Sequence, residues 1–151
     1  MKTPIEILPL GAISAETFRP YGKVIEWQGD EKKNRVNQFR ICVRDCGAPG
    51  WRIAYLIVRE RTINRLERHP CSWESFEPFK GKSLLFVSNQ IRPSRIAAFV
   101  LNKPVVLRKG IWHGIVAVSA QAEVKITENN RVKLQFYRLG VFLPQPPSKK
   151  S

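Results

Sequence analysis

Short runs of β-branched and aromatic residues recur along this chain, separated by stretches that contain Gly, Pro or Asn. Their spacing of about ten residues is typical of an all-β sandwich or barrel. The run 51–58 is the longest, and the runs 123–127 and 131–137 alternate polar and apolar side chains. Because Glu-Asn-Asn at 128–130 separates the last two runs, we expect a tight hairpin turn between them. The short runs of the buried type are 83–88 and 96–101.

One segment favours a helix, the turn that begins at Ser14. The Ser14 side chain can cap this turn, Thr17 stands where a capping box usually has Glu, and Pro20 ends it. We therefore expect one short N-terminal helix on an otherwise all-β chain. At 151 residues the chain is long enough to bury one core, so we expect a single domain over 1–143 and a disordered tail at 144–151.

The formal net charge of +14 is the unusual feature of the composition. The Lys and Arg residues are spread along the chain without a basic, aromatic-bearing helix, which favours a solvated basic surface and makes nucleic acid an unfavoured partner. An odd number of cysteines (Cys42, Cys46 and Cys71) without zinc-finger spacing indicates reduced thiols. No apolar run is long enough for a bilayer span or a signal peptide, so we expect a cytoplasmic protein.

Both histidines of the chain stand in short polar patterns. Glu67 and His69 are two residues apart in an expected strand, so their side chains share a face and point into the sandwich or barrel. Glu74 and Gly81 follow them, and His113 ends the run Gly-Ile-Trp-His. A lone buried histidine is more often a hydrogen-bonded core residue than a ligand. Two histidines with two glutamates leave a metal site and a polar core cavity as alternatives.

This pattern resembles the first motif of the cupin superfamily, with Glu67 in place of its first His. The run 110–113 resembles the end of the second motif. The resemblance implies a cupin-type double-stranded β-helix, or jelly-roll barrel, with a divalent metal ion inside it. The mixture of imidazole and carboxylate donors suits nickel, manganese, iron or zinc. The implied metal ligands are Glu67, His69, Glu74 and His113.

A narrower resemblance is to the ureidoglycolate lyase family, a cupin-fold group of allantoin degradation. Leu66-Glu67-Arg68-His69-Pro70, Phe76-x-Pro78 and Lys80-Gly81 are similar to its central signature. The segments 18–26 and 109–113 are similar to its N-terminal and later signatures, so the resemblance covers most of 5–138. It implies cleavage of ureidoglycolate to glyoxylate and urea, and it implies a homodimer.

The same resemblance implies roles for individual side chains. His69, Glu67 and His113 have the right chemistry for proton transfer, and Lys109 is a further catalytic candidate. The substrate would be a small anion, whose carboxylate needs a cation such as Lys109, Arg68 or Arg40. The expected substrate-binding residues are Arg40, Arg68, Asn37 and Trp112.

Several positions depart from the pattern of that family. Leu107-Arg108 stand where Tyr-His is usual, and Gly114-Ile115 stand where His-Pro is usual. The substrate is therefore left open between ureidoglycolate and a related small carboxylate. Two alternatives remain: a metal-binding cupin enzyme of another activity, such as an isomerase or a dioxygenase, and a non-catalytic barrel that binds a small molecule.

Overall fold

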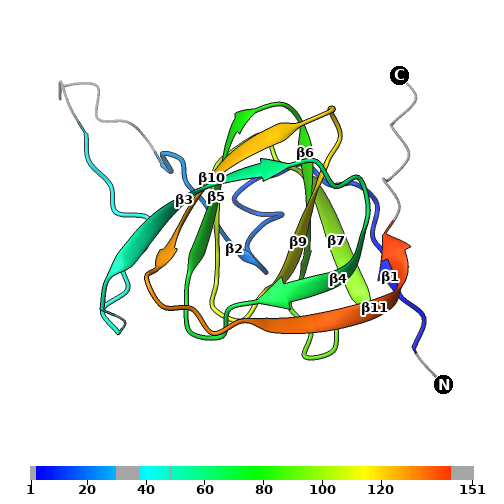
Figure 1. Ribbon diagram of the computed structural model, residues 1–151. Helices are drawn as coiled ribbons and strands as arrows, with labels where there is room; N and C mark the ends of the chain where they lie inside the picture. Colours follow the sequence, from blue (N-terminus) through cyan, green and yellow to red (C-terminus); the bar gives the residue numbers. More distant parts are fainter. Residues whose placement is uncertain (1–2, 30–37, 48, 144–151) are drawn as a thin grey trace.

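The computed structural model describes residues 3–29, 38–47 and 49–143, and the tail expected at 144–151 lies outside them (Figure 1). Within this part of the chain there are eleven strands. They are β1 (Glu6–Ile7), β2 (Gly22–Val24), β3 (Trp51–Val58), β4 (Ile63–Arg68), β5 (Glu74–Lys80), β6 (Ser83–Ser88), β7 (Arg95–Val100), β8 (Val105–Leu107), β9 (Trp112–Ala117), β10 (Ala122–Asn129) and β11 (Gln135–Leu143).

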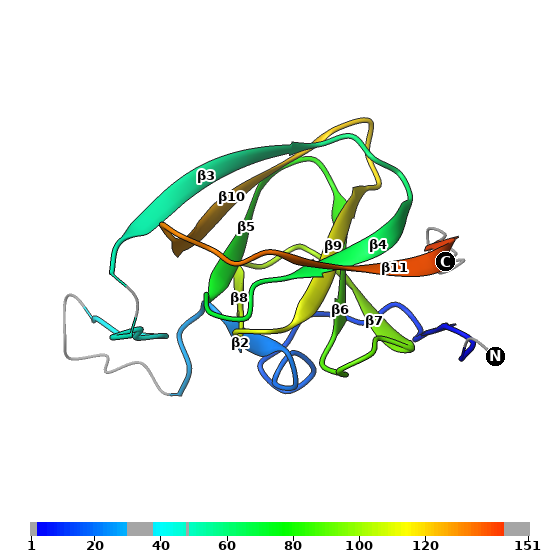
Figure 2. The same cartoon turned by 60° about the horizontal axis from the view of Figure 1, so that its bottom comes forward.

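The strands form two sheets that curve toward each other. One sheet has the order β1-β7-β6-β9-β4-β11 and the other has the order β2-β8-β5-β10-β3. From β4 to β11 the chain changes sheet at every connection except the one between β6 and β7. Figure 1 and Figure 2 show the β3–β10 pair and the β4–β11 pair on opposite sides of an open end. This is a jelly-roll barrel of the cupin type, so the predicted all-β class is confirmed.

The hairpin predicted at 128–130 is wrong. β10 pairs with β3 and β5, whereas β11 begins only at Gln135 and pairs with β4 in the other sheet. The turn-forming residues do end β10, but burial decides where the following strand goes. The inner face of β10 is buried against one side of the barrel, and β11 carries Leu139 and Leu143 into a cluster on the other sheet.

The predicted N-terminal helix is also wrong, because residues 15–21 form only consecutive turns. The expected cap is nevertheless present: Thr17 N donates to Ser14 Oγ at 3.1 Å, and Ser14 N donates to Thr17 Oγ1 at 3.0 Å. One helical turn closed by a cap does not extend, since Pro20 follows and Phe18 is fully buried in the barrel. The described part of the chain contains no helix of the length and hydrophobicity needed to cross a membrane.

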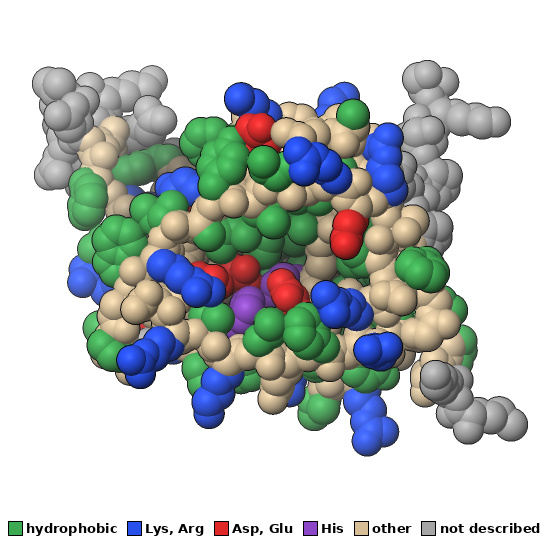
Figure 3. All heavy atoms as spheres, viewed as in Figure 1, with side chains coloured by type: hydrophobic (Ala, Val, Ile, Leu, Met, Phe, Trp, Pro, Cys, Tyr) green, Lys and Arg blue, Asp and Glu red, His purple; other side chains and the backbone are tan. Residues whose placement is uncertain are grey.

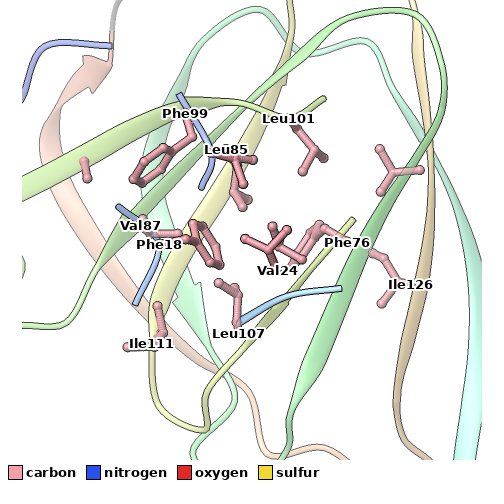
Figure 4. Close-up of a cluster of buried hydrophobic side chains, with 14 residues drawn as sticks. Phe18, Val24, Phe76, Leu85, Val87, Phe99, Leu101, Leu107, Ile111 and Ile126 are labelled. Carbon is pink, nitrogen blue, oxygen red and sulfur yellow. The ribbon is translucent and has the colours of Figure 1, made fainter. Parts of the chain in front are cut away.

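Strand alternation divides the buried hydrophobic side chains between the two faces of the larger sheet. On β6, Leu85 and Val87 face the barrel interior and belong to the cluster in Figure 4. Leu84 and Phe86 belong to a second cluster, against which the residues around β1 pack. Full burial of each such side chain contributes about 2 kcal/mol. The interior cluster includes Phe76, so the core extends to the base of the open end of the barrel.

An apolar surface is exposed on β3. β3 is the edge strand of its sheet, and four outward side chains on it are between 45% and 69% exposed. We call these residues the β3 stripe; they are Trp51, Ile53, Tyr55 and Ile57. The inward side chains of the same strand, such as Leu56 and Val58, are partly or fully buried, which explains why the sequence of β3 is apolar on both faces.

Candidate functional site

Neighbouring strands bring the predicted metal ligands together. Glu67 on β4 pairs in register with His113 on β9, and Glu74 on β5 pairs with Glu128 on β10. His69 follows the end of β4, and its carbonyl oxygen accepts a hydrogen bond of 2.9 Å from the turn before β9. The two sequence patterns, more than forty residues apart, therefore meet inside the barrel because β4 and β9 are neighbours.

The Glu74 carboxylate is at the centre of this cluster. Its Oε2 atom lies 2.9 Å from Nε2 of His113 and 3.1 Å from Nε2 of His69. Glu67 approaches from one side, with its Oε1 atom 3.5 Å from the same Nε2 atom of His113. The centroids of the two imidazole rings are 5.4 Å apart, and Glu74, His69 and His113 are all at most 7% exposed. Two imidazoles and a carboxylate thus face one another out of contact with bulk water.

Backbone carbonyl groups orient both imidazole rings. Nδ1 of His113 lies 3.0 Å from the carbonyl oxygen of Ile111, and Nδ1 of His69 lies 3.3 Å from that of Lys133. Because a carbonyl oxygen only accepts, Nδ1 carries the hydrogen in both rings. In the neutral form of each ring the lone pair is then on Nε2, which points at Glu74. This is the arrangement that second-sphere carbonyl groups impose on histidine ligands of metal ions.

The charges in the cluster stabilise one another. Burial opposes ionisation of Glu74, but His113 and His69 outweigh it and lower the pKa of the carboxyl group from 4.5 to about 2. Burial also opposes protonation of His113, but Glu74 and Glu67 raise the pKa of its imidazole from 6.5 to about 10. The pKa of His69 is raised as well, against burial, by Glu74. Without a metal ion, a buried carboxylate is therefore paired with protonated imidazole at neutral pH.

The donor atoms of the cluster also fit a divalent metal ion. Glu74 Oε2, His113 Nε2 and Glu128 Oε2 are buried, and none has a well-oriented hydrogen-bond partner among the described residues. Donor atoms lie within 4.8 Å of one another in two sets, Glu67-His69-His113 and His69-Glu74-Glu128. Two ligands at about 2.1 Å from one ion and at right angles are about 3 Å apart. The separations of 2.9 Å and 3.1 Å around Glu74 Oε2 match this value.

The sequence reasoning missed one acidic side chain of the site, Glu128, which it assigned to a turn. Glu128 is 8% exposed, and its Oε2 atom lies 3.9 Å from Nε2 of His69. Its other oxygen, Oε1, accepts hydrogen bonds from Nε of Arg52 at 3.0 Å and Nη2 of Arg52 at 2.7 Å. The signal was the alternation along β10, because Val124 and Ile126 face inward and Glu128 is the next residue of that series.

A cavity of about 440 Å³ opens onto the cluster between β3, β4, β9 and β11. His113 is at its base and Glu67, whose side chain is 40% exposed, is at its side. The rest of the lining mixes apolar residues such as Ile115 and Phe136 with the polar and charged residues of β4 and β11. Figure 3 shows histidine and acidic side chains at the bottom of this hollow, with hydrophobic and basic side chains around it. The cavity therefore gives a small molecule access to the buried cluster.

The described residues among those predicted to bind substrate do not line this cavity. Arg68 stacks on the ring of Trp112 at 4.5 Å, and Trp112 is itself buried and donates to a backbone carbonyl. Lys109 forms an ion pair of 3.1 Å with Asp45. Arg40 donates to Gln28 and lines a second cavity, of about 540 Å³. Asn37, the remaining candidate, lies outside the described residues.

Three proteins named ureidoglycolate lyase are similar to this chain in sequence. Those of Escherichia coli K12 and Agrobacterium fabrum are 29% identical to it over 125 residues, which is 72% of this chain and 76% and 74% of theirs. That of Azotobacter vinelandii is 27% identical over 126 residues, 72% of this chain and 76% of the relative. The chain is thus similar to ureidoglycolate lyases over 72% of its length, at less than 30% identity. No family model matches it.

Among solved structures, oxalate decarboxylase of Bacillus subtilis matches with a TM-score of 0.46 and 14% identity, over 60% of this chain and 24% of that chain. A dTDP sugar isomerase of Desulfovibrio desulfuricans matches with a TM-score of 0.44 and 14% identity, over 85% of this chain and 84% of that chain. Likenesses at this level carry no argument about function. The barrel assignment rests instead on the strand order of the chain itself.

Proposed function

We propose that this protein is a lyase that cleaves ureidoglycolate, or a related small carboxylate, to glyoxylate and urea. The observation that carries the proposal is the buried cluster of His69, Glu74 and His113, which a cavity reaches at His113, in a chain similar to proteins named ureidoglycolate lyase. The volume of about 440 Å³ is in the range of small-molecule sites.

The reaction requires one proton to move from oxygen to nitrogen. The hydroxyl group of the substrate loses its proton, its C–O bond becomes the carbonyl bond of glyoxylate, and the C–N bond breaks. The ureido nitrogen gains a proton and leaves as urea, so atoms and charge balance without water. A group that first accepts and then donates the proton is sufficient for this sequence.

Glu67 is suited to that role. It borders the cavity, it is partly exposed, and its carboxylate lies 3.5 Å from Nε2 of His113. In the ionised form it accepts the hydroxyl proton, and in the protonated form it delivers that proton to the leaving nitrogen. His113 lies beside it at the base of the cavity. Lys109 is turned toward Asp45, so we assign it no part in the proton transfer.

The buried side chains are suited to hold a metal ion: His69, Glu74, His113 and Glu128 supply imidazole and carboxylate donors. This donor set favours manganese, iron, nickel or zinc. When bound, such an ion polarises an oxygen of the substrate and stabilises negative charge on it. These four side chains would hold the ion beside the Glu67 carboxylate.

Two measurements test the proposal. Purified protein supplemented with divalent metal should release glyoxylate and urea in equal amounts from ureidoglycolate, and Glu67→Gln should lose this release. Glu77→Gln is the matched control, because Glu77 pairs with Lys125 and is not among the residues that line the cavity. Release no faster than in buffer would refute the lyase proposal.

Elemental analysis of the same preparations tests the metal centre. Wild type should retain close to one equivalent of metal after desalting, whereas His69→Ala and His113→Ala should retain little. A metal-free wild type after supplementation would refute the metal centre. Bound metal without release of glyoxylate would instead support the second candidate, a metal-dependent enzyme for another small carboxylate. The departures at Gly114 and Ile115, which line the cavity, favour that candidate.

A further inference from the structure

Two arginines face each other across the β4–β11 pair. Arg65 and Arg138 are register partners, next to the pair Glu67 and Phe136. Residues two apart on a strand share a face, so Arg65 lies on the same face as Glu67, and Arg138 on the same face as Phe136. All four residues line the cavity of about 440 Å³ above the cluster. The intervening Leu66 packs in the cluster on the opposite face of the sheet.

This arrangement is unfavourable for the protein alone. Like charges directly opposite each other on paired strands destabilise a sheet. Among the described residues, neither the Arg65 nor the Arg138 guanidinium forms a hydrogen bond or an ion pair. Arg65 packs instead against the ring of Phe136, with its Cζ atom 4.6 Å from the ring centroid. By contrast, Arg52 binds Glu128 and Arg61 donates to backbone carbonyl groups.

The stacking on Phe136 leaves Arg65 available to a ligand. A guanidinium that packs its face on an aromatic ring keeps its N–H groups free in its own plane. Those groups form a fork that matches the two oxygens of a carboxylate. The side chain of Arg138, opposite Arg65, offers a second fork from the neighbouring strand.

The charged groups at the other end of the cavity have partners of their own. Three carboxylates, those of Glu67, Glu74 and Glu128, surround the histidines. Because these carboxylates are already paired with the imidazoles and with Arg52, a substrate carboxylate finds guanidinium groups without an ion-pair partner among the described residues only farther along the cavity, at Arg65 and Arg138. Arg65 and Arg138 provide positive charge in the same cavity, two residues along the strands from Glu67 and Phe136.

We propose that Arg65 and Arg138 bind the carboxylate of the substrate and direct the carbon that reacts toward Glu67 and His113. The ligand class is a small α-hydroxy carboxylate or its α-keto product. The reaction of this ligand rests on the proposed lyase function, whereas its binding to the two arginines does not. Arg40, Arg68 and Lys109, which the sequence suggested for this role, have partners elsewhere.

The test uses the metal-supplemented full chain and lactate as a stable α-hydroxy carboxylate. Isothermal titration should detect lactate binding to wild type, and lactamide, its uncharged counterpart, should bind at least tenfold more weakly. Arg65→Gln and Arg138→Gln should each weaken lactate binding about tenfold or more, as expected for loss of a charge-assisted hydrogen bond. Both should raise KM for ureidoglycolate more than they lower kcat.

Arg92→Gln is the matched control, because Arg92 is an exposed arginine that is not among the residues that line the cavity. Both cavity variants should unfold at the same temperature as wild type or higher, since a like-charge contact is removed. Unchanged lactate binding in both variants would overturn the proposal. Weakened lactate binding in a protein that releases no glyoxylate would support the arginine site and refute only the lyase function. If the variants release glyoxylate with an unchanged KM, the result would support the lyase function and refute the arginine site.

Discussion

In the metal-free protein, Glu74→Gln is expected to lower thermal stability most strongly between pH 4.5 and 6.5. Glu74 is 5% exposed, and its carboxylate contacts both histidines. Burial opposes its ionisation, yet the imidazoles lower the pKa of Glu74 from 4.5 to about 2. At about 1.4 kcal/mol for each tenfold change in proton affinity, this corresponds to roughly 3 kcal/mol of stability. For a domain of this size, that is a shift of about 10 °C in Tm.

The sign of the pH dependence follows from the two pKa values. Because the pKa of Glu74 is lowered on folding, its contribution is present above pH 4.5 and is lost as the pH falls through about 2. Because the pKa of His113 is raised on folding, its contribution is present below pH 6.5 and is lost as the pH rises through about 10. The difference in Tm between wild type and Glu74→Gln should therefore become smaller both below pH 4.5 and above pH 6.5.

Thermal unfolding in the presence of a chelator, followed by circular dichroism at a series of pH values, measures this difference. Glu77→Gln on the same strand is the control; its partly exposed ion pair with Lys125 should change stability by less than about 1 kcal/mol. Equal Tm values for wild type and Glu74→Gln within the window would refute the pairing. A difference that persists unchanged down to pH 2 would show that packing, and not charge, stabilises this site.

Four further outcomes are expected. Arg52→Gln removes the hydrogen bonds that hold the Glu128 carboxylate, so it should weaken metal affinity about 10- to 100-fold. Competition with a chromophoric chelator measures this affinity. Gly81→Ala should destabilise the fold by about 3 kcal/mol or more in urea unfolding, since φ is +70° and a Cβ atom would overlap the carbonyl oxygen of Gln121. Gly29→Ala, at φ +83° with open space around it, should cost only about 1 kcal/mol. If the protein forms the expected homodimer through the β3 stripe, Ile53→Glu should convert it to a monomer in light scattering at unchanged Tm.

The residues of the first pattern, which are candidate metal ligands, were accessible to sequence reasoning because they are close in the chain. A strand has a period of two, so Glu67 and His69 had to share a face once the segment was taken as extended. Glu74 follows after a short connection. His113 could be added because it is the second of only two histidines and stands in a recognisable run. The contacts with Glu74 are consistent with that set.

The rest of the site depends on pairings between strands that are distant in sequence. Glu128 reaches the cluster only because β10 lies beside β5, and Arg138 reaches the cavity only because β11 lies beside β4. Local turn chemistry at 128–130 suggested that the segments joined there would pair with each other. Burial of both strands in different sheets overrode that preference.

The sequence by itself determined the all-β class, several strands such as β3 and β6, and the four residues of the recognisable patterns, since these follow from side-chain alternation and local spacing. The tertiary structure alone decided the strand order, the place of Glu128 beside His69, and the two arginines that face each other in the cavity. The physical reason is that backbone hydrogen bonds between strands are nearly independent of side-chain identity. Which strands become neighbours is therefore decided by how the whole chain buries its apolar faces.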